Sequence, residues 1–409
     1  MSVSISNYRS RIISIYTSNY RSLDELTGFT LGDLTALVGP NGSGKSNFCD
    51  VFRFIADALK IGLEAAVDKR HGISAIRRWS SGRPNRIKFE FYLNVSHVDE
   101  EEMLIDPYSS PNCLYVLVLG SNGSKDFQVR HESAALKLPN QESGNSFIVR
   151  DGTWLEGPSD LRPRVAPLGL ALSLVAGDER FRPIADALRN VSIYSIFPDT
   201  LRELQKPDHS RPMSEHGGNW SSILKDMKEE SGSLDLIAAI GQLTGDIDEF
   251  RVRQLAGYLV TEFRHGQTTP TGKNGKPKPR WFEAAQESDG TLRMAGILTA
   301  LLQEPSPTLL GIEEPELTVH PGAIPLLYDH IKEASQRGQV ILTTHSPDLL
   351  ALLDADEVRV VERHDGITTV GPMDEAQRQA VNDRLFTPGD LLRMEGLKQG
   401  PRVKSNQET

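Results

Sequence analysis

The run Gly39-Pro40-Asn41-Gly42-Ser43-Gly44-Lys45-Ser46 matches the pattern G-x-x-x-x-G-K-[ST] at every fixed position. An apolar run at 34–38 precedes it and predicts a strand, and apolar residues at steps of three and four predict a helix over 46–66. A turn between a strand and a helix is where a phosphate-binding loop, or P-loop, is expected, because its backbone N–H groups can wrap phosphate. We call residues 39–46 the P-loop. We therefore predict that Lys45 reaches the β- and γ-phosphates of ATP and that Ser46 binds Mg²⁺. The predicted nucleotide contacts are Asn41, Gly42, Ser43, Gly44, Lys45, Ser46 and Asn47.

The composition is that of a globular protein with more than one structural unit. Its 409 residues give two or three units at roughly 100–200 residues each. With 45 Lys and Arg against 55 Asp and Glu, the net charge is −10, which excludes a general nucleic-acid coat, so any DNA contact needs a local basic patch. Two cysteines exclude a disulfide framework. Because no apolar run reaches the ~18 residues of a membrane helix, we expect a cytoplasmic protein without a membrane partner.

Two carboxylates follow a second apolar strand. The run Leu309-Leu310-Gly311-Ile312 ends at Glu313 and Glu314, which is the form of a Walker B segment. Adjacent side chains at a strand end point to different sides, so we predict that Glu313 holds Mg²⁺ and that Glu314 deprotonates the attacking water. Two solvated acids that cap a strand are the alternative, which the P-loop in the same chain disfavours.

A histidine follows the next apolar strand. His345 lies in Thr343-Thr344-His345-Ser346, directly after Val340-Ile341-Leu342. Ligands bind at the carboxyl edge of an open parallel sheet, so His345 is a candidate hydrogen-bond partner of the γ-phosphate. A lone histidine is more often structural, but the two other nucleotide motifs favour the functional interpretation.

The pattern along the chain divides it into five segments. Strand-like alternation dominates the first part, and a helical pattern begins near residue 160, with one face at Leu236, Ile237, Ile240 and Leu243 and another at Val252, Leu255 and Leu259. The α/β pattern then returns. The predicted segments are 1–100, the first part of an ATPase head; 101–159, a β-rich lobe; 160–284, an inserted, mainly helical lobe with a basic loop; 285–375, the second part of the head; and 376–409, a C-terminal extension.

Two acid-free basic clusters are candidates for DNA contact, although basic runs are usually solvated surface. The first surrounds an aromatic residue that could stack on a base, and the second lies in a Gly/Pro/Lys-rich stretch. The first contains Arg77, Arg78, Trp79, Arg83, Arg86 and Lys88, and the second contains Arg264, Lys273, Lys276, Lys278 and Arg280.

These motifs together resemble the ABC-type head ATPases of the SMC, RecF and OLD group, and within it the small stand-alone ATPases without a coiled coil or nuclease domain. The resemblance covers roughly residues 10–95 and 285–395. It rests on the P-loop and on Asn19-Tyr20-Arg21-Ser22, Ser288-Asp289-Gly290-Thr291, Ile312-Glu313-Glu314-Pro315-Glu316, Val319-His320-Pro321, Thr343-Thr344-His345-Ser346-Pro347 and Pro388-Gly389-Asp390-Leu391-Leu392.

The resemblance implies an α/β fold, an ABC-type P-loop NTPase head with a mixed or parallel sheet, an antiparallel β lobe and the inserted helical lobe. It also implies that Ser288 and Gly290 form a signature motif that contacts the γ-phosphate held by a second copy, so that ATP joins a homodimer or a higher oligomer. Arg21 would contact the nucleotide or the partner head, with an exposed solvated arginine as the alternative. Two features depart from the group: Glu313 stands where many relatives carry Asp, and no glutamine lies between Ser46 and Gln128 to fill the Q-loop.

The expected function is that of an Mg²⁺-dependent ATPase that acts as a switch in DNA repair or in defence against foreign DNA, through a separate effector protein or DNA. The ATP-binding subunit of a transporter and a non-hydrolysing scaffold are the alternatives. The signature sequence disfavours the first, and the presence of Lys45, Glu314 and His345 disfavours the second. Because only 64 residues follow His345, and a nuclease domain needs ~100, we expect no nuclease in this chain.

Overall fold

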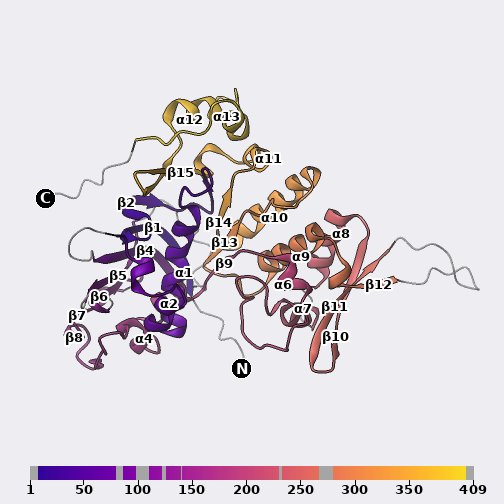
Figure 1. Cartoon of the computed structure of the whole chain (residues 1–409). Helices are drawn as coiled ribbons and strands as arrows, with labels where there is room; N and C mark the ends of the chain where they lie inside the picture. The colour runs from indigo at the N-terminus through magenta and orange to yellow at the C-terminus, as the bar shows by residue number, and fades with distance from the viewer. Residues whose placement is uncertain are drawn as a thin grey trace, which may run out of the picture.

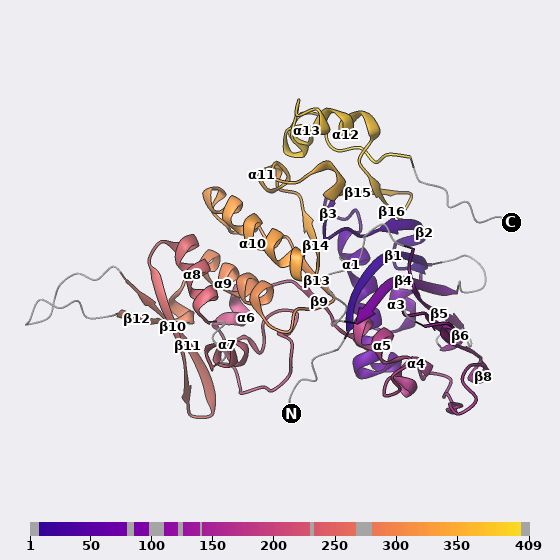
Figure 2. The ribbon, with the colours of Figure 1, turned by 180° about the vertical axis from the view of Figure 1, so that it is seen from behind.

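A computed structural model of the chain describes residues 8–79, 86–97, 110–121, 126–139, 141–229, 233–266 and 280–401. A large mixed sheet runs through these residues, with the antiparallel N-terminal strands on one side and a second lobe on the other (Figure 1). Helices α12 (Glu375–Asn382) and α13 (Pro388–Met394) cap it at the top of both views (Figures 1 and 2). No described helix is long and apolar enough to cross a bilayer.

The main sheet has the strand order β8-β7-β6-β5-β4-β1-β2-β16-β15-β3-β14-β13-β9 in the described residues. Strands β15, β3, β14, β13 and β9 are mutually parallel, and β8 to β2 form an antiparallel run. Their bounds are β1 Tyr8–Tyr20, β2 Leu23–Thr30, β3 Leu34–Val38, β4 Ile87–His97, β5 Cys113–Ser121, β6 Phe127–Leu136, β7 Asn145–Arg150, β8 Thr153–Glu156, β9 Val191–Tyr194, β13 Leu309–Glu313, β14 Gln339–Thr344, β15 Val358–His364 and β16 Ile367–Pro372.

The helix after the P-loop forms the centre of the first hydrophobic core. Helix α1 (Lys45–Ile61) buries the predicted face that contains Phe48, Phe52 and Ile55 against the antiparallel strands. The predicted helix over 46–66 is interrupted at Gly62, whose φ of 93° lies in the left-handed region that glycine tolerates. The chain then continues as α2 (Leu63–Asp68) and α3 (Ile73–Ile76).

Short helices connect the β lobe to the second lobe. They are α4 (Ala171–Val175), α5 (Arg182–Arg189) and α6 (Pro198–Arg202). Strand β9 follows α5 and pairs with β13 in the main sheet. The segment predicted as an inserted helical lobe over 160–284 therefore includes one strand of the main sheet.

The second lobe contains helices and a small antiparallel sheet. Helices α7 (Trp220–Glu229) and α8 (Ser233–Thr244) precede β10 (Ile247–Leu255), β11 (Tyr258–His265) and β12 (Arg280–Glu283), which pair in that order. Leu236 and Ile240 are buried on α8 as predicted. The predicted helical face at Val252, Leu255 and Leu259 is wrong, because these residues lie in the β10–β11 hairpin. Ala256 and Gly257, with φ of 50° and 84°, form the turn.

The elements of the second half complete the parallel part of the main sheet and its second hydrophobic core. Helices α9 (Asp289–Leu302) and α10 (Ile324–Arg337) pack in the second hydrophobic core with β3, β13 and β14, and α11 (Pro347–Leu350) follows β14. The parallel strands β3, β13 and β14 end side by side, at Val38, Glu313 and Thr344. The P-loop, Glu314 and His345 therefore all follow the same edge of the sheet.

Candidate functional site

The P-loop is held in shape by close backbone approaches. A side chain on Gly39 would place its Cβ 2.2 Å from the Val361 carbonyl oxygen, and one on Gly44 would place its Cβ 2.1 Å from Thr368 Oγ1. Gly44 also has a φ of 105° at the start of α1. Glycine is thus required at both positions, for space and, at Gly44, also for backbone conformation.

Polar side chains from other strands fix the first turn of α1. Asn47 Nδ2 donates to Ser22 Oγ at 2.7 Å, and Thr368 Oγ1 donates to the Ser43 carbonyl at 2.7 Å. Asn47, a predicted nucleotide contact, therefore has a structural hydrogen bond, whereas Ser46 is exposed in the first helical turn. The N-terminus of α1 is open to an anion on that side.

Lys45 lies back on its own loop. Its Nζ donates to the carbonyls of Gly39 at 2.7 Å and Pro40 at 3.2 Å. Burial lowers the pKa of Lys45, and the nearby carboxylates Glu314, Glu316 and Glu313 oppose this shift. The ammonium group thus lies near three acids, and within the described residues its hydrogen bonds go to backbone carbonyls, which a polyphosphate can replace.

Glu314 and His345 meet at the end of the parallel strands. His345 Nδ1 lies 3.5 Å from Glu314 Oε1, and both side chains are partly exposed. Glu314 adopts a φ of 48°, which is unusual for a residue with a side chain. Hydrogen bonds from its backbone N–H to the carbonyl oxygen of Thr343 at 2.9 Å and to the hydroxyl at 3.2 Å hold this conformation. The carboxylate is therefore positioned by its backbone at the mouth of the site.

The Glu313 side chain lies near a basic and an acidic residue, Arg53 and Glu215, that the sequence motifs did not indicate. Arg53 NH2 on α1 lies 3.5 Å from Glu313 Oε1 and 3.1 Å from Glu215 Oε1. Burial raises the pKa of Glu313, and the Arg53 charge opposes the shift. Arg53 thus connects the P-loop helix, the Walker B strand and the loop that carries Glu215.

The donor set beside the P-loop fits Mg²⁺. Glu313 Oε1 is buried and lies 3.5 Å from Arg53 NH2, but it accepts no hydrogen bond from the residues that the structure describes, and Ser46 is exposed where α1 begins. Mg²⁺ prefers hard oxygen ligands and commonly takes one or two from protein while phosphates and waters supply the rest.

The signature segment begins α9 in an exposed position. Ser288 is the N-cap, and its Oγ accepts a hydrogen bond from the Thr291 backbone N–H at 3.1 Å. A Cβ on Gly290 would lie 2.8 Å from the Thr318 carbonyl oxygen, so the chain passes too closely there for a side chain. Ser288 and Gly290 therefore lie on a surface turn fixed by the fold.

A buried arginine joins α9 to the Walker B segment. Arg293 NH2 donates to the carbonyls of Glu314 at 2.9 Å and Glu313 at 3.3 Å, and NH1 donates to the Ile196 carbonyl. Burial lowers the pKa of Arg293, opposed by Glu314 and Glu316. The signature helix and the backbone of the candidate base are thus parts of one hydrogen-bonded unit, which residue spacing in the sequence could not reveal.

Arg21 is held by an ion pair beside a basic recess. Its Nε lies 2.8 Å from Asp50 Oδ2, and its φ is 50°. The recess, about 480 Å³, is lined by Arg21, Asn47 and Arg77. The Nε and NH2 of Arg77 are buried and have no hydrogen-bond partner in the described part of the chain. The exposed Trp79 completes one wall. The first basic cluster is therefore adjacent to the P-loop.

Some other members of the two basic clusters have acidic partners, and others lie outside the described residues. Lys88 pairs with Glu90, and Arg264 pairs with Asp248 and Glu249. Four further members, Arg83, Lys273, Lys276 and Lys278, lie outside the described part of the chain.

The geometry defines a P-loop ATPase head, and the family comparison agrees with it. The family described as "AAA domain, putative AbiEii toxin, Type IV TA system" matches residues 34–103 and 140–351. This match covers more than half of the chain, so the protein belongs to that family of AAA-type ATPases.

Comparisons with individual proteins extend this result. The chain is 24% identical over 365 residues to the Old nuclease of Escherichia phage P2, a match that covers 83% of this chain but 57% of that relative. Its fold is similar to that of an Smc head bound to the C-winged helix domain of ScpA, with a TM-score of 0.54, 16% identity and coverage of 90% of this chain and 99% of that one. A second Smc head, bound to the C-terminal domain of ScpA derived from Pyrococcus furiosus, matches with a TM-score of 0.51 and 14% identity. That match covers 92% of this chain and 99% of the other. The predicted fold class and the resemblance to SMC and OLD ATPases are confirmed.

Proposed function

We propose that this chain is an Mg²⁺-dependent ATP hydrolase. The observation that carries the proposal is the convergence of Lys45, Glu314 and His345 at one edge of the parallel strands, with 3.5 Å between the histidine and the carboxylate. Lys45 would exchange its two carbonyl contacts for the β- and γ-phosphates. Glu314 would take the proton of the attacking water, and His345 would hold both Glu314 and the γ-phosphate in line.

The remaining site residues position the substrate. The backbone of 41–46 would wrap the phosphates, and Ser46 and Glu313 would hold Mg²⁺, which neutralises phosphate charge when bound. Arg21 and Asn47 line the recess next to the P-loop, on the side where the nucleoside of ATP would extend. Each group acts on charge and orientation, which is where phosphoryl transfer gains most of its rate.

The exposed signature turn supports a dimer joined by ATP. Ser288 is exposed at the N-terminus of α9, so it can face the γ-phosphate of a second copy. Because Arg293 connects α9 to the carbonyl of Glu314, a partner's γ-phosphate bound at this turn would also stabilise the position of Glu314. Two copies would sandwich two ATP molecules and separate after hydrolysis.

The relatives support the proposed cellular role, which is the broadest part of the proposal. The likeness to a phage nuclease and to an Smc head supports a switch in DNA repair or in defence against foreign DNA, acting through DNA or a separate effector protein. The chain spans 57% of the nuclease, so the activity of that whole protein does not transfer with the match.

Steady-state phosphate release tests the hydrolase. The wild-type chain with ATP and Mg²⁺ should release phosphate, and EDTA should stop it. Lys45→Ala should abolish release and tight ATP binding while the fold is retained, and the exposed Lys225→Ala serves as the matched control. ATP binding without release would indicate the scaffold, and unchanged ATP affinity in Lys45→Ala would contradict the P-loop assignment.

A further inference from the structure

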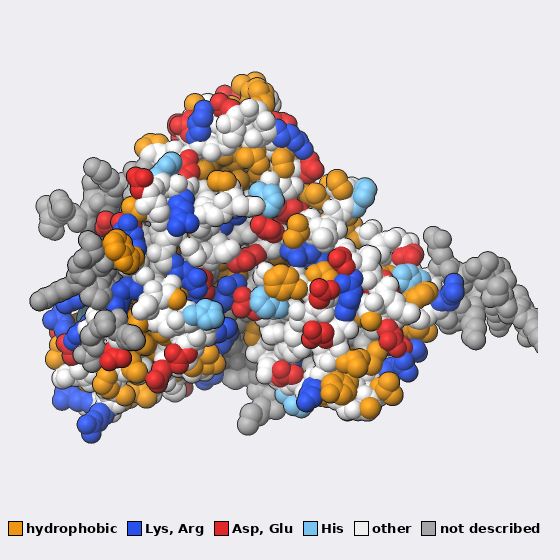
Figure 3. Space-filling model, viewed as in Figure 1, with side chains coloured by type: hydrophobic (Ala, Val, Ile, Leu, Met, Phe, Trp, Pro, Cys, Tyr) orange, Lys and Arg blue, Asp and Glu red, His pale blue; other side chains and the backbone are white. Residues whose placement is uncertain are grey.

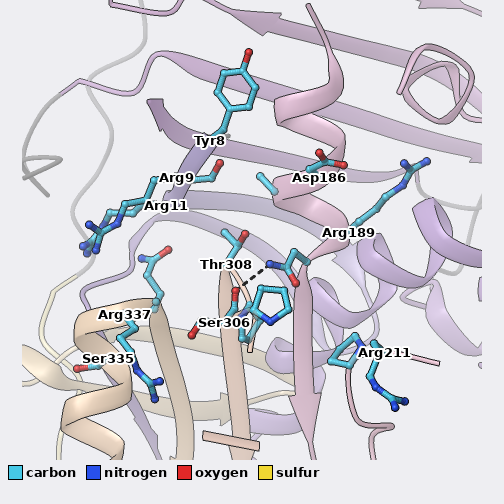
Figure 4. A pocket seen from close by; sticks show the side chains of 18 of the residues that line it. Tyr8, Arg9, Arg11, Asp186, Arg189, Arg211, Ser306, Thr308, Ser335 and Arg337 are labelled. Atoms are coloured by element: carbon cyan, nitrogen blue, oxygen red, sulfur yellow. Dashed lines mark hydrogen bonds between the residues drawn. The ribbon is translucent and has the colours of Figure 1, made fainter. Parts of the chain in front are cut away.

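A second cavity lies at the opposite edge of the parallel strands from the P-loop. It measures about 450 Å³ (Figure 4). Its lining includes Thr308, which directly precedes β13, Gln339, the first residue of β14, and Lys60 near the end of α1. The five residues of β13 separate the two edges by about 16 Å at ~3.3 Å per residue. The cavity is therefore distinct from the ATP site.

Basic side chains dominate this cavity although the chain is acidic overall. Its described lining contains seven Lys or Arg residues and one acid, Asp186, in a chain of net charge −10. The molecular face seen in Figure 3 instead shows acidic and basic side chains interspersed. The charge of the cavity is thus a local concentration, and it attracts anions.

Four of the seven cations already have an acidic partner. Arg11 pairs with Asp33, Arg182 with Asp186, Arg211 with Asp226 and Arg337 with Glu304. These ion pairs restrain the four guanidinium groups around the cavity and partly neutralise their charge. The positive charge of the cavity therefore comes mainly from the other three cations.

The other three cations bond only to backbone carbonyls within the part of the chain that the structure describes. Arg9 NH2 donates to the Gln336 carbonyl at 3.3 Å, Lys60 Nζ to Val191 at 3.4 Å and Arg189 Nε to Leu59 at 3.1 Å. Arg9 and Arg189 lie on opposite sides of the hollow in Figure 4. Cations without an acidic hydrogen-bond partner among the described residues therefore lie on two walls of the cavity.

Neutral hydrogen-bonding groups complete the lining. Ser306 and Thr308 lie between the basic walls, and Asn190 Nδ2 donates to the Ser306 carbonyl at 3.1 Å. A few convergent polar groups in a concave space of 300–1,000 Å³ are typical of small-molecule sites. Arginine forks match phosphate oxygens in geometry as well as charge.

We propose that this cavity binds a compact ligand that carries two or more phosphate groups, at a site separate from the P-loop. The size favours a free small molecule over nucleic acid, because specific nucleic-acid interfaces bury about 1,000–2,500 Å² along an extended surface. The proposal goes beyond the ATPase and does not depend on it.

Calorimetric titration with inorganic tripolyphosphate tests the proposal, in a Lys45→Ala background that disables the P-loop. Tripolyphosphate should bind with one site per chain. The double variant Arg9→Glu/Lys60→Glu, at two exposed positions, should weaken binding at least about tenfold, because it replaces attraction by repulsion. Arg150→Glu/Lys206→Glu, also exposed and outside the lining, makes the same charge change and should alter the affinity less than about twofold.

Four outcomes would overturn the proposal. They are the absence of tripolyphosphate binding in the Lys45→Ala chain, an equal loss in the control variant, binding that Arg9→Glu/Lys60→Glu leaves unchanged, and tight binding of a 5′-phosphorylated single-stranded oligonucleotide in place of tripolyphosphate. Circular dichroism of each variant ensures that a loss of affinity is not a loss of fold.

Discussion

Replacing Arg293 by Met should reduce both stability and hydrolysis. The change keeps the aliphatic stem but removes donation to the carbonyls of Ile196, Glu313 and Glu314. A hydrogen bond from a charged donor contributes about 1.5–3 kcal/mol, and the cost of burying the guanidinium offsets part of three such bonds. Because three carbonyls lose a donor, we expect Arg293→Met to lower the free energy of unfolding by about 3–5 kcal/mol.

The kinetic effect of Arg293→Met follows from the backbone of Glu314. That residue is held at a φ of 48° by bonds to Thr343 and Arg293. Loss of one restraint allows the carboxylate to shift, and a misplacement of about 1 Å costs roughly 10²-fold in rate. We therefore expect a loss of kcat between tenfold and a hundredfold, with ATP affinity nearly unchanged.

Urea denaturation and phosphate release measure the two effects separately. Arg378→Met, which removes a surface ion pair with Asp356, is the control and should cost less than about 1 kcal/mol. If Arg293 acts on hydrolysis through Glu314, Arg293→Met should add no further kinetic loss to Glu314→Gln. A full additional loss in the double variant, or unchanged kcat in the destabilised single variant, would refute the reasoning.

Two further predictions concern the surface turn and the second lobe. Ser288→Arg should block ATP-dependent dimerisation while each monomer still binds ATP, which light scattering and calorimetry would show; a normal dimer would remove Ser288 from the interface. Burial lowers the pKa of His265, but its hydrogen bonds to Asp246 at 2.7 Å and Glu287 at 2.8 Å outweigh burial and raise it. This stabilisation is complete below the unfolded pKa of about 6.5 and is lost as pH rises through the raised value. His265→Gln should therefore lower the free energy of unfolding by about 1–2 kcal/mol at pH 6 and by less at pH 9, and equal losses at both pH values would contradict a charged His265.

The parts of the fold that the sequence predicted correctly have a local cause. The P-loop, its helix and the strand before Glu313 each carry a complete signal within a few residues: glycines at fixed positions and an apolar run of the right period. Because parallel strands end at a common edge, the meeting of Glu314 with His345 could also be expected.

The errors arise where a local pattern is ambiguous. Val252, Leu255 and Leu259 satisfy a helical spacing of three and four, but Ala256-Gly257 makes a hairpin turn between them. The four residues of β9 are too short to give a period, and pairing with β13 determines their structure. In both cases tertiary pairing prevails over local spacing.

The residues that sequence reasoning missed act through long-range contacts. Arg53 and Glu215 lie far apart in the sequence, yet Arg53 NH2 and Glu215 Oε1 are 3.1 Å apart in the structure. Arg293 lies within an apolar helix and reaches the backbone of Glu314. A single arginine in a helix carries no signal of its partner, so only the fold could identify these contacts.

The most direct test of the ATP-joined dimer is the mass in solution of Glu314→Gln with ATP and Mg²⁺, measured by light scattering. The carboxamide keeps the size of the side chain but cannot take a proton, so hydrolysis should slow by roughly 10²-fold or more while ATP stays bound. We predict that the mass shifts from one chain to two on adding ATP and returns to one in Glu314→Gln/Ser288→Arg. A Glu314→Gln chain that binds ATP, hydrolyses it slowly and remains a monomer would contradict the account.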